Sequence, residues 1–310
     1  SSSIAYLGRR LLNRELGKKA VWTTLDSPDQ KRLFRHSAAS FLTALGQNLR
    51  SRIDPLLIAK FTTLDRVSDY SVGARFLVFF EDIVNALLGG HLLAAFSQIE
   101  SRDGKAALNS IFLNSLKLAT AISVLGAGAM LVFGQAFIRR WVGDGFDDAA
   151  IVLMILAPPY ALRLAAYPAG NLLYSLGKHA NLAAINFGGG IANLILSLVL
   201  IWKIGFFGVV WATALELVVV GVIVLPAVVC KASGIPYTAY LRKFFSSLLL
   251  AALPIAAFWW LARSLITPDY LRMSLLGSAL GVIYSIWSWF VLLDSTQRNF
   301  ILDSLRSRRN

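Results

Sequence analysis

The chain has 310 residues, of which 56% are hydrophobic and 15% are charged, and its formal net charge is +13. Soluble domains carry about 25% charged residues, so this composition excludes an ordinary soluble protein and favours a membrane protein. In a membrane protein, an excess of Lys and Arg is typical of loops that face the cytoplasm and its anionic lipids. The charge therefore does not indicate a nucleic-acid partner.

The sequence shows none of the short motifs that accompany common catalytic or metal sites. Its three histidines, His36, His91 and His179, are far apart, and the single cysteine, Cys230, excludes an internal disulfide. No glycine-rich phosphate loop and no nucleophile elbow occurs. We therefore expect no catalytic residue, no metal and no cofactor, and hence not an enzyme. Because Ser1 is not an initiator methionine, we also expect an upstream part to be missing.

A polar, basic stretch at 1–36 is followed by eight mostly apolar segments that are long enough to cross a membrane. They run over 37–61, 70–98, 108–134, 149–175, 179–202, 206–229, 244–264 and 272–294. All are predicted to be helices, because an open sheet cannot satisfy its backbone hydrogen bonds in lipid. The predicted fold is all-α and polytopic, with a linker at 1–36, a loop at 230–243 and a basic tail at 295–310.

The distribution of Lys and Arg predicts the orientation of these segments. If 1–36 is cytoplasmic and the segments alternate, the inside stretches hold 18 Lys and Arg residues and the outside loops hold 6. Positive charge is enriched on the cytoplasmic side of membrane proteins. The sequence therefore predicts a protein of the cytoplasmic (inner) membrane with both ends in the cytoplasm.

The first segment, 37–61, carries charges near its middle. Arg50 and Asp54 are four residues apart, so they share one helical face and can partly neutralise each other. Arg52 points elsewhere and needs another partner or water, and Pro55 disfavours helical geometry just before it. Two interpretations stay open: a kinked helix with an internal ion pair, or a kinked helix that lines a basic cavity.

The second segment, 70–98, carries charges as well. Arg75 and Asp82 are seven residues apart on one face, and Glu81 and Asn85 complete a polar sector. A structural ion pair and a cavity wall are both consistent with this pattern, because ionisable residues inside membranes either pair or line aqueous space.

Later segments add an amide face and an isolated acid. Asn186 and Asn193 share one face of 179–202 with small residues, which we interpret as a helix-packing face. Glu216 is the one ionisable residue in 206–229, and it is predicted to be protonated or paired with a basic residue of a neighbouring helix. The candidates for coupling to a proton or another cation are Asp54, Asp82 and Glu216.

The fourth segment, 149–175, combines several polar side chains on one face. At 100° per residue the following fall within about 80° of arc: Tyr160, Arg163, Tyr167, Asn171 and Tyr174. Aromatic residues at helical spacing more often pack in a core, but a guanidinium among phenols favours a cavity wall. We expect Pro158 and Pro159 to start the helix and Pro168 to act as a hinge.

The order of these features resembles a known transporter superfamily. Three stretches carry the resemblance: "RIDPLLIAKFTTLDRVSDYSVGARF", "GNLLYSLGKHANLAAINFGGGIANLILSLVLI" and "KIGFFGVVWATAL". Together with the apolar segments around them, over 37–229, they resemble one lobe of the multidrug/oligosaccharidyl-lipid/polysaccharide exporters, and in particular the flippases of polysaccharide and O-antigen biosynthesis. The resemblance implies a six-helix second lobe at 37–229, two additional helices at 244–294, and a first lobe upstream that is needed for transport.

The resemblance also implies the substrate and the residues that receive it. The substrate class is a polyprenyl-pyrophosphate-linked glycan, which is a precursor of lipopolysaccharide or a related polymer and lies in membrane lipid. Arginines can clamp pyrophosphate oxygens, and tyrosines can stack on sugar rings. The candidate substrate-binding residues are Arg50, Arg52, Arg75, Tyr160, Arg163, Tyr167, Asn171 and Tyr174.

Three other functions stay open on the sequence alone. One is a drug or metabolite extruder of the same superfamily driven by Na⁺ or H⁺, although such a protein would favour acids over arginines in its cavity. Another is a polytopic membrane glycosyltransferase or polymerase, which the short outside loops disfavour. The third is a structural membrane subunit without a cavity.

Overall fold

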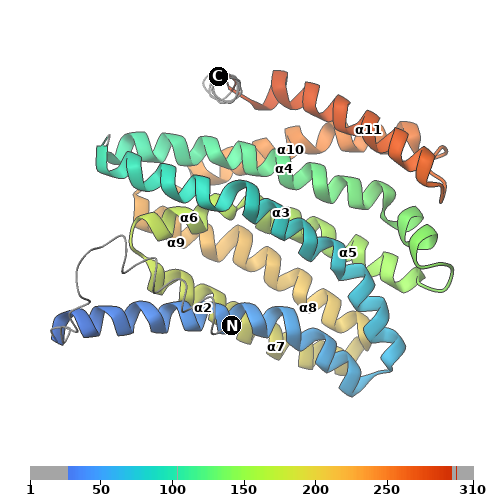
Figure 1. Cartoon of the computed structure of the whole chain (residues 1–310), viewed down its shortest axis with the longest axis horizontal. Coiled ribbons are helices and arrows are strands. Elements are labelled where there is room, and N and C mark those ends of the chain that lie inside the picture. Colours follow the sequence, from blue (N-terminus) through green and yellow to red (C-terminus); the bar gives the residue numbers. More distant parts are fainter. Residues whose placement is uncertain (1–26, 103, 295–297, 299–310) are drawn as a thin grey trace, which may run out of the picture. The chain divides into compact units, whose positions relative to one another are not determined.

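The computed structural model describes residues 27–102, 104–294 and 298, and nearly all of them are helical (Figure 1). The chain divides into two units, residues 1–38 and residues 39–310. In the first unit the described residues form the beginning of helix α2 (Ser27–Phe61), so the last part of the predicted linker is helical. Residues 1–26 of that linker, and the predicted tail at 295–310 apart from Arg298, lie outside the described residues.

The second unit holds the rest of α2 and every later described helix. These are α3 (Leu64–Arg102), α4 (Gly104–Trp141), α5 (Asp147–Ala165), α6 (Tyr167–Ser175), α7 (His179–Ile204), α8 (Phe206–Val218), η1 (Val219–Val224), α9 (Leu225–Ser233), α10 (Tyr237–Ala262), α11 (Tyr270–Trp287) and η2 (Ser288–Leu292). The segments η1 and η2 are π-helical, a wider coil that often occurs at functional sites. The described residues contain no strand, which confirms the all-α prediction.

The described part contains 7 helical stretches that are long and apolar enough to cross a membrane. They begin at Leu64 and end at Leu292, and they match the last seven predicted spans within a few residues at most ends. The predicted first span, 37–61, is helical but does not belong to this set, because its charged residues lower its mean hydropathy. The predicted count of eight is therefore not confirmed.

The fourth predicted span is divided into α5 and α6 close to Pro168. The helix starts at Asp147, so Pro158 and Pro159 lie inside α5 and the expectation that they start the helix is wrong. The break falls at Ala166, between α5 and α6, two residues before Pro168. Proline lacks the backbone donor that would bond four residues back, and it restricts the residue before it. The expected hinge at Pro168 therefore coincides with an observed interruption of the helix.

Small residues bring the central helices together. Helix α5 packs against α3, α4 and α8. At Gly73 of α3, an added Cβ would lie 2.5 Å from the carbonyl oxygen of Ala149 in α5. At Gly208 of α8, it would lie 2.3 Å from the carbonyl oxygen of Leu200 in α7. Such backbone approach is typical of membrane bundles, where packing rather than hydrophobic burial holds helices together.

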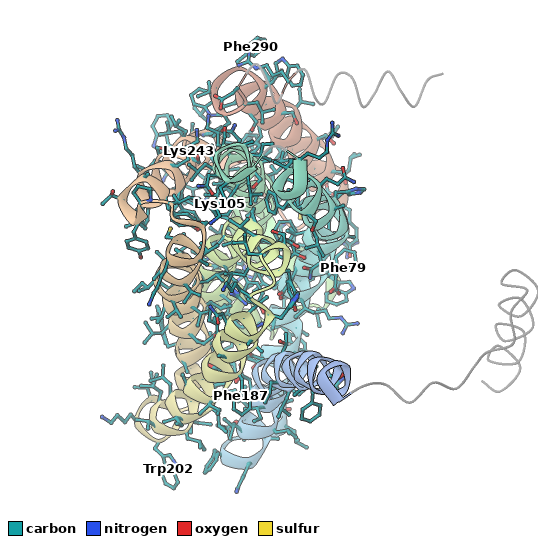
Figure 2. All side chains as sticks on the ribbon, turned by 90° about the vertical axis from the view of Figure 1, so that its left-hand side faces the viewer. Phe79, Lys105, Phe187, Trp202, Lys243 and Phe290 are labelled. Carbon is teal, nitrogen blue, oxygen red and sulfur yellow. The ribbon has the colours of Figure 1, made fainter. Side chains whose placement is uncertain are left out.

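The two additional helices pack against α4 (Figure 1). The Tyr284 hydroxyl donates to the carbonyl of Ala121 at 2.9 Å, and the Trp287 indole donates to the carbonyl of Leu250 at 2.9 Å. Large apolar side chains project outward, among them Phe79, Trp202 and Phe290 (Figure 2). This exposure is what helices need if they face lipid.

Asp294, just after η2, connects the end of the second additional helix to α4. Its two carboxyl oxygens each accept a hydrogen bond of 2.7 Å from the Lys117 ammonium. This hydrogen bond holds the pKa of Asp294 below its usual range. Lys117, a cation inside a predicted span, thus has its partner at the end of the last described helix.

Candidate functional site

A polar cavity opens between helices of the second unit, with an empty volume of ≈ 710 Å³ when the open solvent at its mouth is included. Its lining consists of Thr43, Glu81, Asn85, Arg163, Leu164, Tyr167, Gly170, Asn171, Tyr174, Leu182, Asn186 and Leu225. One guanidinium, one carboxyl, two phenols and three amides therefore meet in this cavity. Polar groups at membrane depth usually face aqueous space or a substrate path.

Four of the predicted binding residues lie in this cavity: Arg163, Tyr167, Asn171 and Tyr174. The break at Ala166 separates the first from the other three, and the polar face nevertheless continues across it. Nη2 of Arg163 donates to Oδ1 of Asn186 in α7 at 3.3 Å. This hydrogen bond helps to orient the guanidinium within the cavity.

The other predicted binding residues lie elsewhere. Tyr160 is half-buried in the apolar core with residues of α3 and α4. Arg52 and Arg75 are exposed and do not line this cavity. The side chain of Arg50 lies outside the described part of the structure.

Of the four residues in the predicted polar sector of α3, two line the cavity and two do not. Arg75 and Asp82 are both exposed, and the described residues show no ion pair between them. Seven residues of α-helix span about 10 Å, which is long for direct pairing. Instead Glu81 and Asn85, four residues apart, line the cavity. The cavity-wall interpretation therefore holds for Glu81 and Asn85, and not for the candidate binding residue Arg75 or the candidate coupling residue Asp82.

Asp54 forms a second polar site, fully buried at 0% exposure. Its Oδ2 accepts hydrogen bonds from Tyr70 Oη at 2.7 Å and from Thr213 Oγ1 at 2.6 Å. Its Oδ1 accepts one from Asn193 Nδ2 at 3.2 Å. Three neutral donors from α3, α7 and α8 thus converge on one carboxyl group of α2. We call these four residues the Asp54 cluster.

The Asp54 cluster changes two interpretations made from the sequence. The expected pairing of Asp54 with Arg50 concerns a side chain outside the described part, and the described partners of Asp54 are uncharged. Asn193 and Asn186 were assigned to helix packing, yet one binds Asp54 and the other binds Arg163. They are seven residues apart on one face of α7, which therefore connects the cavity to the cluster.

Metal binding by a set of protein side chains finds no support in the described residues. They contain no group of three or more His, Cys, Asp or Glu side chains placed to hold a metal ion. The Asp54 cluster offers one carboxyl group, two hydroxyls and an amide. In the described structure, the hydroxyls and the amide of this cluster donate hydrogen bonds to the Asp54 carboxyl group.

Curated relatives of the chain include a probable flippase. Over 206 residues, 66% of this chain, it is 26% identical to the probable low-salt glycan biosynthesis flippase Agl15 of Haloferax volcanii, with 43% of that protein covered. Over 290 residues, 90% of this chain, it is 21% identical to the uncharacterized membrane protein EpsK of Bacillus subtilis, with 55% of that protein covered. The chain spans about half the length of these relatives.

No protein-family model and no solved structure matches the chain. The relatives and the apolar helices together support a flippase-like membrane protein, all-helical in its described part.

Proposed function

We propose that this chain is the second lobe, with two additional helices, of a transporter that flips a lipid-linked oligosaccharide or polysaccharide precursor across the cytoplasmic membrane. The observation that carries the proposal is the polar cavity, in which Arg163 lies beside Tyr167, Asn171 and Tyr174. The probable flippase among the relatives points to the same class of activity. The first lobe would lie upstream, in keeping with the share of the relatives that this chain covers.

The cavity suits the head group of such a substrate. A guanidinium can bind pyrophosphate oxygens through two parallel hydrogen bonds, while phenols and amides can bind sugar hydroxyls. The polyprenyl tail can stay in the surrounding lipid while the head group crosses through the polar interior. No bond is made or broken in this process, so the protein would act as a transporter and not as an enzyme.

We propose that both ends of the chain lie in the cytoplasm, on the basis of the Lys and Arg distribution. Cysteines introduced singly at Lys178 and Asp144, in a Cys230→Ser background, test this orientation with an impermeant thiol reagent in intact cells. Both positions are in loops between described helices. Labelling is expected at position 144 and not at 178, and the reverse pattern would refute the orientation.

A transport assay with two substrates tests the function itself. The complete transporter, with its upstream lobe, is reconstituted in vesicles that contain a polyprenyl-pyrophosphate-linked glycan or a cationic drug. The glycan lipid should flip at least about ten times faster than in protein-free vesicles, because its charged head group crosses pure lipid very slowly. Movement of the drug without movement of the glycan lipid would favour the drug-extruder alternative and contradict the proposal.

A further inference from the structure

Two lysine side chains meet where α4 and α10 pack against each other. Lys117 of α4 donates hydrogen bonds of 2.7 Å to both carboxyl oxygens of Asp294. Lys243 of α10, which Figure 2 labels, lies within hydrogen-bonding distance of the Lys117 ammonium and within electrostatic range of Asp294. Arg298 is within electrostatic range of the same carboxyl group. Three cations therefore surround one acid in the described structure, and like charges at this range repel each other.

A groove adjoins this lysine pair along the first turns of α10. Its lining consists of Pro236, Thr238, Ala239, Arg242, Lys243 and Ser246, and its empty volume is ≈ 930 Å³ when open solvent is included. None of these lining residues is acidic. Among the residues that the structure describes, neither Arg242 nor Lys243 takes part in an ion pair. The groove thus presents two cations and the Thr238 hydroxyl, all of them hydrogen-bond donors, so it suits an anion whose oxygens accept.

The face of α10 that carries this groove becomes apolar toward the middle of the helix. At 100° per residue, Leu249 and Leu253 lie within about 20° of Arg242 around the helix. Both leucines are exposed, at 67% and 53%. Arg242 and Lys243 lie near the start of α10, which is long and apolar enough to cross a membrane. One face therefore offers cations near a membrane surface and, about 10 Å deeper, apolar side chains.

We propose that this groove binds the phosphate group of an anionic phospholipid. Arg242 and Lys243 contact the phosphate, and the acyl chains lie along Leu249 and Leu253. A phosphodiester is negatively charged and its oxygens accept hydrogen bonds, so it supplies a second counter-charge beside the Lys117–Lys243 pair. In the orientation proposed above, this end of α10 faces the cytoplasm, where anionic lipids attract clustered Lys and Arg. Lipid binding does not depend on the proposed transport function.

The position of the groove predicts an effect on stability. Lys243 belongs to the groove and also lies beside Lys117, which is bound to Asp294 at the end of the last described helix. A phosphate in the groove would therefore reduce the repulsion at the contact between α4 and α10. Because a ligand of the folded state raises its stability, the melting temperature of the chain should be higher with anionic than with zwitterionic lipid.

Lipid binding by this chain in detergent tests the proposal. Dioleoylphosphatidylglycerol and dioleoylphosphatidylcholine, which have the same acyl chains, are titrated separately, and bound lipid is measured by native mass spectrometry. Phosphatidylglycerol should bind at least about ten times more tightly, because no choline cancels its phosphate charge. Arg242→Gln combined with Lys243→Gln should lower this preference to about one. An unchanged preference in that double variant would overturn the proposal.

Two matched variants separate this site from general charge. Arg242→Lys combined with Lys243→Arg keeps both charges and should keep most of the preference. Lys203→Gln combined with Arg263→Gln removes two exposed charges at the C-terminal ends of α7 and α10, and should keep the preference as well. A loss in this second variant equal to that in Arg242→Gln/Lys243→Gln would show that net charge, and not the groove, attracts the lipid.

A further comparison decides between a lipid and a free phosphate compound. Glycerol 3-phosphate in excess should not displace phosphatidylglycerol, because it lacks the acyl chains. Leu249→Ala combined with Leu253→Ala should weaken phosphatidylglycerol binding although both cations remain. Displacement by glycerol 3-phosphate, with no effect of the leucine changes, would show that the groove takes a free phosphate compound and would contradict the proposal.

Discussion

Asp54→Asn is expected to abolish gradient-driven export and to leave the protein at least as stable as the wild type. Asp54 is fully buried, and its described partners are neutral. A buried carboxylate without a counter-charge is costly, so its neutral isostere should not weaken the fold. Export in cells, at matched protein levels, should fall at least about ten-fold if the site acts in coupling.

Two further variants separate function from folding at this position. Asp54→Ala leaves the donors of Tyr70, Thr213 and Asn193 without their acceptor, at about 1–3 kcal/mol per buried unpaired group. Its melting temperature in detergent should therefore fall, in contrast to Asp54→Asn. Asp65→Asn changes an exposed acid in the first turn of α3 and should export normally. Normal export by Asp54→Asn would show that Asp54 is structural.

Arg163→Ala is expected to weaken binding of the pyrophosphate head group by about ten- to a hundred-fold, because a hydrogen bond to a charged group contributes roughly 1.5–3 kcal/mol. Arg163→Lys keeps the charge but lacks the planar fork, so it should restore export only in part. The measurement is glycan export in cells by the complete transporter, with membrane levels of each variant matched.

Two controls decide how Arg163 acts. Asn186→Ala removes the hydrogen bond that orients the guanidinium but leaves the guanidinium in the cavity. It should reduce export less than Arg163→Ala does. Arg102→Ala changes an exposed arginine at the end of α3 and should have no effect. Equal losses in Asn186→Ala and Arg163→Ala would indicate that Arg163 holds α5 to α7 and does not bind substrate.

The all-helical membrane fold could be predicted from local features of the sequence. Runs of apolar residues longer than a bilayer core leave helices as the structure that satisfies the backbone in lipid. The residues of α6 that line the cavity could also be assigned to the polar face of Arg163, because they follow it at the helical spacing of three to four residues. This spacing is a local feature of the sequence, and it continues across the break at Ala166.

The partners of Asp54 could not be predicted in this way. Tyr70, Asn193 and Thr213 are 16, 139 and 159 residues away along the chain. Local periodicity says which face of a helix is polar but not which other helix that face meets. In membranes this choice depends on close backbone contacts, such as those of Gly208 and Gly73, whose sites the sequence shows only as small residues.

The class of protein, most of its spans and the polar face that carries Arg163 thus follow from the amino-acid sequence alone. The packing of the helices sets the rest: Arg75 and Tyr160 lie away from the cavity, Glu81 lines it, and Asp54 and Glu216 lie near each other with different surroundings. The physical reason is that helix formation in lipid follows from hydrophobicity over about twenty consecutive residues. The surroundings of a buried charge depend instead on side chains that distant helices bring together by packing.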